Sequence, residues 1–292
     1  MKPTDITKLK HLAQDKISRS ANPAIVRNST VFFKNMQELI KQENLVKKGS
    51  KVDFYEYGRA GSQTTIALQN FISDLEGAHR TFLTSTGFGA VALAILSICR
   101  PKDEIIVTDA VYAPTRMITS KLLKEFNVKT HFYNPESLES LQSKINKKTK
   151  MIFVENPGSN TFEFQDLSKI IKIAKKRKII TAIDNTWGTP FFIKPLKIGF
   201  DMSISSGTKY LSGHSDVMLG SLAVNKKVFE KVKFCNKLLG YRASPDDAYL
   251  VLRGLRTLDI RLKKHEENTK KIVNFLKKEK KIKEILYPHK RG

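Results

Sequence analysis

The segment Ser203–Ser221, SISSGTKYLSGHSDVMLGS, decides the fold of this 292-residue chain. Its lysine, Lys209, stands among glycine, serine and threonine, whereas many other lysines lie in charged runs such as 175–178, KKRK. A lysine on a solvated surface does not require small, hydroxyl-bearing neighbours. A lysine whose amine condenses with an aldehyde beside a phosphate does require them, because it must be partly desolvated. We therefore interpret Lys209 as a reactive lysine.

Upstream of Lys209, runs rich in Ile and Val alternate with helical patterns. The runs cover residues 104–109, 150–155, 178–184 and 200–205, and the helical patterns cover 115–126, 136–145 and 166–178. Strands that are apolar throughout and separated by helices are typical of a parallel sheet buried on both faces. The sequence therefore predicts an α/β fold with a mostly parallel sheet that helices cover on both faces.

Composition narrows the function classes. The longest nearly apolar stretch, Phe88–Cys99, is too short to cross a bilayer, and residues 1–16 lack the apolar segment of a secretory signal. The two cysteines, Cys99 and Cys235, lie far apart and outside any CxxC pattern. The simplest interpretation is a cytoplasmic protein with reduced thiols, no disulfide framework, no metal site and no membrane partner.

The formal net charge of +24 suggests a nucleic-acid ligand, because basic surface is the footprint of phosphate-backbone binding. Most of the excess is lysine, however, and it is spread over amphipathic segments such as 166–178 and 268–285. No aromatic and basic stacking motif accompanies it. We interpret these lysines as solvated helix faces and expect no nucleic-acid partner.

Polar residues follow the predicted strands at the points where the strands end. Asp109, which leads to Tyr112, ends the first run, Glu155 and Asp184 end the next two, and the last run leads into 206–209, SGTK. Ligands of open parallel sheets bind beyond the carboxyl ends of the strands. We therefore predict one site that gathers these residues.

The stretch Thr84–Gly89 adds a second element, because its small residues lead directly into an apolar helix. Backbone N–H groups at Gly87 and Gly89 would form a phosphate cradle there. Residues 87–92, GFGAVA, also fit the GxGxxA motif of NAD-binding oxidoreductases, with Asp109 as the ribose-binding acid. This alternative places about 80 residues before a motif that usually opens its domain, and it gives Lys209 no role.

Pyridoxal 5'-phosphate (PLP) would use these residues together. It requires a lysine for its aldehyde, an acid for its ring nitrogen and donors for its phosphate. Lys209 supplies the first and Asp184 the second, while Ser206 and Thr208 join the Gly87 loop around the phosphate. We therefore predict a PLP-dependent enzyme with a small-molecule substrate.

Residues 206–216, SGTKYLSGHSD, resemble the lysine motif of the Cys/Met-metabolism family of PLP enzymes, and the resemblance extends over about residues 22–287. Within the family, three segments are similar to bacterial cystathionine β-lyases. They are 57–61, YGRAG; 155–159, ENPGS; and 184–187, DNTW. The resemblance implies the aspartate-aminotransferase-like fold, which is known as fold type I.

The resemblance also implies a role for each site residue. Lys209 would hold the cofactor and move the α-proton, Asp184 would pair with the ring nitrogen, and Tyr112 would stack on the ring. Tyr57 and Arg59 would reach the phosphate of a neighbouring subunit, which implies a homodimer or a dimer of dimers. The remaining phosphate-binding residues would be Gly87, Phe88, Ser206 and Thr208.

The implied reaction is α,β-elimination of a sulfur amino acid. Cystathionine would yield homocysteine, pyruvate and ammonia, as in methionine biosynthesis. The γ-synthase and γ-lyase reactions of the same family stay open, because the choice between β and γ cleavage depends on fine placement of the substrate.

The resemblance divides the chain into an N-terminal arm at 1–50, a PLP-binding large domain at 51–245, and an interdomain helix with the start of a truncated C-terminal domain at 246–292. Residues 282–288, IKEILYP, form a lone strand-like piece in the last part. The family's arginine for the substrate carboxylate lies beyond residue 292. We therefore expect inefficient turnover of cystathionine by the chain alone. The arginines that match the interdomain helix instead are Arg253, Arg256 and Arg261.

Overall fold

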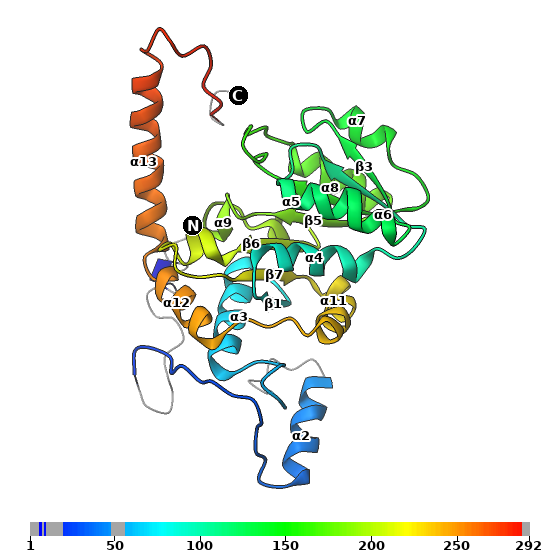
Figure 1. Ribbon diagram of the computed structural model, residues 1–292, viewed down its shortest axis with the longest axis vertical. Coiled ribbons are helices and arrows are strands. Elements are labelled where there is room, and N and C mark those ends of the chain that lie inside the picture. Colours follow the sequence, from blue (N-terminus) through cyan, green and yellow to red (C-terminus); the bar gives the residue numbers. More distant parts are fainter. Residues whose placement is uncertain (1–5, 8, 10–19, 48–55, 288–292) are drawn as a thin grey trace.

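The computed structural model describes residues 6–7, 9, 20–47 and 56–287. Within this part of the chain, seven strands form one sheet in the order β1-β7-β6-β5-β4-β2-β3 (Figure 1). The strands are β1 (Arg80–Thr84), β2 (Glu104–Thr108), β3 (Lys129–Tyr133), β4 (Thr149–Glu155), β5 (Ile180–Asp184), β6 (Met202–Ser206) and β7 (Gly220–Val224).

Helices precede the sheet, connect its strands and follow it. The longer ones are α2 (Met36–Lys47), α3 (Gln63–Glu76), α4 (Gly87–Ile98), α8 (Leu167–Lys176), α11 (Lys226–Leu239), α12 (Pro245–Leu255) and α13 (Leu258–Leu276). The shorter helical segments are α5 (Ala113–Met117), η1 (Ile118–Leu122), α6 (Leu123–Glu125), α7 (Leu138–Ser143), α9 (Thr189–Phe192), α10 (Pro195–Ile198) and η2 (Gly207–Leu211).

Five neighbouring strands, β3, β2, β4, β5 and β6, run parallel, whereas β7 is antiparallel to both β6 and β1. The prediction of a mostly parallel sheet is confirmed, and the four predicted strands are β2, β4, β5 and β6. The sequence pattern does not predict β1, β3 and β7. Their sequences, RTFLT, KTHFY and GSLAV, contain at most three consecutive apolar residues, and so short a run does not identify a strand by itself.

Successive residues of the central strands enter different cores on the two faces of the sheet. In β2, Ile105 and Val107 pack in the core that includes α4 and α11, whereas Ile106 packs in the core that includes α8. Side chains of neighbouring residues in a strand point to opposite faces, so an apolar run such as EIIVT serves both cores. Helices therefore cover both faces, as predicted.

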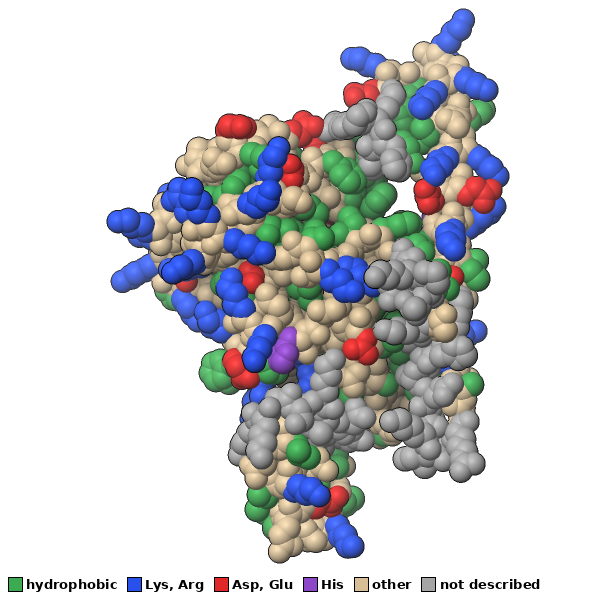
Figure 2. All heavy atoms as spheres, turned by 180° about the vertical axis from the view of Figure 1, so that it is seen from behind, with side chains coloured by type: hydrophobic (Ala, Val, Ile, Leu, Met, Phe, Trp, Pro, Cys, Tyr) green, Lys and Arg blue, Asp and Glu red, His purple; other side chains and the backbone are tan. Residues whose placement is uncertain are grey.

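Helix α8 shows where the excess positive charge lies. Asp166 caps it by accepting the Lys169 N–H, and Ile170, Ile171 and Ala174 are buried along one side. Its lysines occupy the opposite, solvated side, as expected for an amphipathic helix. Figure 2 shows the same arrangement over the surface, with Lys and Arg side chains scattered across this face and along α13 and not gathered into one patch.

The structure also describes possible membrane spans and the two thiols. No described helix combines the length and apolar character that are needed to span a bilayer. Cys99 is buried, Cys235 is half-buried, and both are free thiols.

The C-terminal part differs in two ways from its sequence pattern. The long helical stretch from residue 245 is two helices, α12 and α13, that meet at Arg256–Thr257, and α13 extends away from the sheet (Figure 1). The strand prediction for residues 282–288 is wrong, because 282–287 form no strand. A short segment with no partner strand cannot satisfy its backbone groups as a sheet. The domain boundaries stay a prediction, and the boundary at 50/51 lies outside the described residues.

Helix α12 packs directly on the backbone that follows Lys209. A Cβ atom on Gly254 would lie 2.6 Å from the Leu211 carbonyl oxygen and would overlap the carbonyl group of Ser212. Glycine is therefore required at this helical position because two backbone segments approach each other closely.

Gly254→Ala is expected to destabilise the fold by about 1–3 kcal/mol through overpacking, although the same change in an ordinary helix interior is stabilising. Urea unfolding checks this expectation. Arg253→Ala, at the exposed neighbouring position of α12, is the control and should change the free energy of unfolding little. Equal stability of Gly254→Ala and the wild type would contradict the close packing.

Candidate active site

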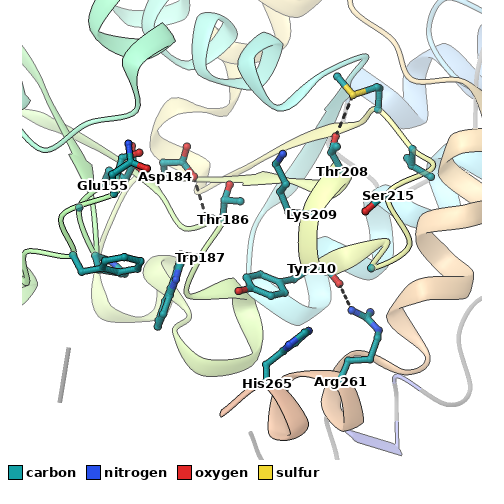
Figure 3. Close-up of a pocket in the computed structure, with 18 of the residues that line it drawn as sticks. Glu155, Asp184, Thr186, Trp187, Thr208, Lys209, Tyr210, Ser215, Arg261 and His265 are labelled. Atoms are coloured by element: carbon teal, nitrogen blue, oxygen red, sulfur yellow. Dashed lines mark hydrogen bonds between the residues drawn. The ribbon is translucent and has the colours of Figure 1, made fainter. Parts of the chain in front are cut away.

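A cavity of about 1150 Å³ opens beyond the carboxyl ends of β4, β5 and β6. Glu155, Asp184, Thr208 and Lys209 line it, together with Trp187 from the turn after β5. These are residues that the sequence places at strand ends. The predicted convergence is confirmed for these three strands, and Figure 3 shows the Lys209 side chain between Thr186 and Thr208.

Lys209 lies in the short turn η2 that follows β6, and its backbone leaves helical geometry there, with φ −95° and ψ −117°. The turn is held against the strand that follows it, because Thr208 N–H donates to the Leu219 carbonyl at 3.2 Å. A Cβ atom on Gly207 would lie 2.7 Å from Leu219 Cδ2. Gly207 is small because the turn touches Leu219. The Lys209 side chain itself is exposed in the single chain, so the partial desolvation expected from the sequence is not seen there.

Arg261 of α13 holds the end of the same loop. Its guanidinium donates to the carbonyl oxygens of Tyr210 and Gly254, both at 2.8 Å, and to Thr257 Oγ1 at 3.0 Å (Figure 3). Arg256 donates to the Ala21 carbonyl at 2.6 Å. Both arginines thus bind protein groups, which agrees with their interpretation as interdomain-helix residues and not as ligands of a substrate carboxylate.

Two carboxyl groups lie side by side in the pocket. Glu155 and Asp184 are directly paired in the ladder between β4 and β5. Burial, and then the charge of Asp184, raise the pKa of Glu155 to about 8. Burial also raises the pKa of Asp184, and hydrogen bonds from Thr186 oppose that rise. Asp184 Oδ1 accepts the Thr186 N–H at 2.9 Å.

Tyr112 lies at the start of α5, and its N–H donates to Glu155 Oε2 at 2.7 Å. Its side chain is 48% exposed and does not line the cavity within this chain. The structure therefore brings the Tyr112 backbone to the acid pair. Asp109, which ends the preceding strand, instead forms an ion pair with Arg116.

The predicted phosphate cradle lies between β1 and α4. Thr86 caps α4 by accepting the Gly89 N–H at 2.9 Å. A Cβ atom on Gly87 would lie 2.6 Å from Ser206 Oγ, so the glycine backbone directly faces the serine that ends β6. Phe88 is 40% exposed beside it. The structure thus joins two segments that lie more than 100 residues apart in sequence.

The sheet order contradicts the alternative of an NAD-binding motif. That motif requires the glycine-rich strand and the strand with the acid to be parallel neighbours. Here β1 lies at the edge of the sheet and is antiparallel to β7, while β2, which precedes Asp109, lies beyond β7, β6, β5 and β4. The NAD interpretation of residues 87–92 is therefore wrong.

Tyr57 and Arg59 lie outside the cavity of this chain. Tyr57 forms an isolated bridge with Thr30, and Arg59 donates weakly to the Lys237 carbonyl of α11 at 3.4 Å. Both side chains are exposed. Their predicted role toward a neighbouring subunit is not tested by a single chain.

Sequence reasoning gave no role to Thr186. Its Oγ1 accepts the Ser206 N–H at 2.8 Å while its own N–H binds Asp184, so it joins the ends of β5 and β6. The position of Thr186 directly after Asp184 and Asn185, at the end of a predicted strand, was the sequence feature that could have indicated this role. The aromatic pair Phe162 and Trp187, whose ring centroids are 6.2 Å apart, was also missed as a pair because the residues are distant in sequence.

Comparison of the chain with known proteins identifies its family. Residues 6–291 match the family model described as Cys/Met metabolism PLP-dependent enzyme. This chain belongs to that family. Its fold is accordingly PLP-dependent fold type I, and its cofactor is pyridoxal 5'-phosphate.

Relatives in the family carry different reaction names. The chain is 33% identical over 271 residues to a cystathionine beta-lyase of Haemophilus influenzae. The matched segment covers 92% of this chain and 67% of that protein. The chain is also 32% identical over 275 residues to an L-alanine/L-glutamate racemase of Wolbachia pipientis. That match covers 92% of this chain and 68% of the racemase. The structure of a cystathionine gamma-lyase from Lactobacillus plantarum, complexed with L-serine, superposes with a TM-score of 0.89 at 28% identity, covering 99% and 72%.

The residues of the cavity fit this cofactor. A lysine and a buried carboxyl group line the same cavity, and the Gly87–Ser206 contact forms a narrow cradle that a single Cβ atom would fill. When bound, PLP supplies a ring that takes up the electron pair left at Cα when the α-proton is removed.

Gly87→Ala is expected to weaken PLP binding by about tenfold or more, because a methyl group against Ser206 costs on the order of 1–3 kcal/mol where the phosphate is to bind. Spectrophotometric titration of the apoprotein measures this affinity. Gly89→Ala is the control, because the structure removes Gly89 from the predicted cradle: its N–H donates to Thr86 Oγ1, and its Cβ atom would come no closer than 3.3 Å to side-chain atoms. Equal losses in the two variants would show that the Gly87 cradle is not the phosphate site.

Proposed function

We propose that this protein is a PLP-dependent carbon–sulfur lyase that cleaves the β C–S bond of cystathionine to give homocysteine, pyruvate and ammonia. The observation that carries the proposal is the meeting of Lys209 with Asp184 in one cavity, at the strand ends that border the Gly87–Ser206 cradle. The DNTW and YGRAG segments and the names of relatives support the β-lyase reaction over others of the family.

In this proposal each residue acts at a stated group. Lys209 Nζ would hold the cofactor through its aldehyde and, once released, would accept the α-proton of the substrate. Asp184 would hold the ring nitrogen, and Tyr112 would hold the ring. The β C–S bond would break with loss of the thiolate, which takes up a proton to give homocysteine, and one water would be consumed to give pyruvate and ammonia. The phosphate ligands are Gly87, Phe88, Ser206 and Thr208.

The proposal includes a homo-oligomer in which Tyr57 and Arg59 serve the site of a neighbouring subunit. It is supported by their exposed side chains and by their position outside the cavity of their own chain. Each subunit would then contribute residues to its partner's phosphate site, so a complete site requires at least two copies.

Lys209 is expected to be the attachment point of the cofactor. Borohydride reduction of the PLP-loaded chain should leave a pyridoxyl group on the peptide that contains Lys209, because reduction makes the lysine–aldehyde linkage permanent. Peptide mass spectrometry measures this. Lys178→Ala, an exposed lysine, should label like the wild type, and Lys209→Ala should lose the label. A label on other peptides only would refute the assignment.

The products distinguish the proposed reaction from its alternatives. With cystathionine, β-cleavage releases pyruvate, whereas γ-cleavage releases α-ketobutyrate, so assaying both compounds identifies the bond that breaks. A second candidate, amino-acid racemisation, is favoured by the relative named as a racemase. It would appear as D-alanine from L-alanine, because Cα loses and regains a proton with no β-bond cleavage. Pyruvate as the dominant product supports the proposal, and α-ketobutyrate or D-alanine as the dominant product contradicts it.

A further inference from the structure

The Glu155 carboxyl is a half-buried acid that the proposed chemistry does not use. It lines the same cavity as Lys209 and Asp184 (Figure 3). Glu155 ends β4 as the direct partner of Asp184 in the parallel ladder, and paired residues of neighbouring strands project to the same face. Two acids therefore occupy one corner of the pocket.

Two carboxylates that share one corner of a pocket are not both ionised at neutral pH without a large cost, because the charge of one disfavours ionisation of the other. The charged group that acts on Glu155 is Asp184 on β5, while Lys209 on η2 lines the same cavity and the backbone N–H of Tyr112 donates to Glu155. The hydrogen bonds from Thr186 favour a negative charge on Asp184. Burial, and then the charge of Asp184, raise the pKa of Glu155 to about 8, and the Tyr112 hydrogen bond only partly opposes that rise.

Glu155 also has a geometric task. Its Oε2 accepts the Tyr112 N–H at 2.7 Å. Tyr112 begins α5 and makes no capping hydrogen bond through its own side chain. The contact with Glu155 thus ties the start of α5 to the end of β4, directly beside Asp184. A neutral carboxyl or an amide oxygen can also accept this hydrogen bond, although a carboxylate accepts it more strongly, so the bond opposes the rise in the pKa of Glu155.

We propose that Glu155 is a positioning residue whose neutral carboxyl holds Tyr112 in place and leaves Asp184 as the charged acid of the pair. A single negative charge then faces the ring nitrogen of the cofactor. The inference rests on the proposed roles of Asp184 and Tyr112, and it does not depend on which bond of the substrate is cleaved.

Two variants of Glu155 test whether the site requires a negative charge at this position or only an oxygen that accepts the Tyr112 hydrogen bond. They are Glu155→Gln and Glu155→Ala. Glutamine keeps an oxygen acceptor without a charge, so at pH 7 its PLP affinity and the visible circular dichroism of bound PLP should match the wild type. Alanine removes the acceptor for Tyr112, and its PLP affinity should fall by about tenfold, with a weaker dichroic band. Glu163→Gln is the matched control, since Glu163 is half-buried on the adjoining loop but outside the cavity lining.

The apoprotein gives a second readout that requires no cofactor. Because the folded pKa of Glu155 is raised from 4.5 to about 8, the folded state holds a proton that the unfolded state has lost between these pH values. The stability that this proton contributes is present below pH 4.5 and is lost as pH rises through about 8. The Tm of the wild type should therefore fall relative to that of Glu155→Gln between pH 5 and pH 9, by several degrees.

The results that would overturn the inference about Glu155 differ from those that would refute the proposed function. A Glu155→Gln variant that loses PLP affinity at pH 7 as severely as Glu155→Ala would overturn the inference, because a negative charge would then be required. Parallel Tm curves for Glu155→Gln and the wild type from pH 5 to pH 9 would also overturn it. Failure of Lys209 to carry the cofactor would refute the proposed function, whereas the Tm comparison of the apoprotein would still decide the state of Glu155.

Discussion

The close contact between the turn that carries Lys209 and its two neighbours is the constraint on which the site depends. Gly207 lies against Leu219, and the following carbonyl groups lie against Gly254 of α12. A Cβ atom on Gly254 would meet backbone carbonyl groups, and one on Gly207 would meet the Leu219 side chain. The hydrogen bonds of Arg261 then join α13 to the same turn. The turn that contains Lys209 is thus held by Leu219, directly before β7, and by the C-terminal helices together.

The pocket is rich in acids, although the chain as a whole is strongly basic. The formal net charge is +24, yet the cavity is lined by four acids, Glu155, Asp184, Asp216 and Asp247, and by two strong bases, Lys209 and Arg261. Exposed lysines on faces such as that of α8 are well solvated, and salt screens them from a buried site. Burial removes that screening within the pocket, so the pKa of each acid depends on its immediate neighbours.

Reaction choice within this family depends on how the substrate is placed in the site. Removal of the α-proton by a lysine is common to β-elimination, γ-elimination and racemisation. What separates them is how the side chain of the substrate is held and which bond is aligned with the ring. The aromatic pair Phe162 and Trp187 at the cavity and the subunit contacts proposed for Tyr57 and Arg59 are the parts of this chain that bear on that placement.

Several features of the protein followed from the sequence alone. Apolar runs identified β2, β4, β5 and β6, and the residues after them identified the acids and the lysine, because strand ends of a parallel sheet share one edge. The motif around Lys209 indicated the family. These signals are local, so a single stretch of chain contains them.

Only the tertiary structure decided the rest. Strands β1, β3 and β7 are recognised by their partners and not by their composition, and the 282–287 segment forms no strand because it has no partner. The order of the strands separated Gly87 from Asp109 and removed the NAD interpretation, while it placed Gly87 against Ser206. The pairing of Glu155 with Asp184 likewise depends on strand order. Contacts between distant segments arise from packing in three dimensions, which no local pattern records.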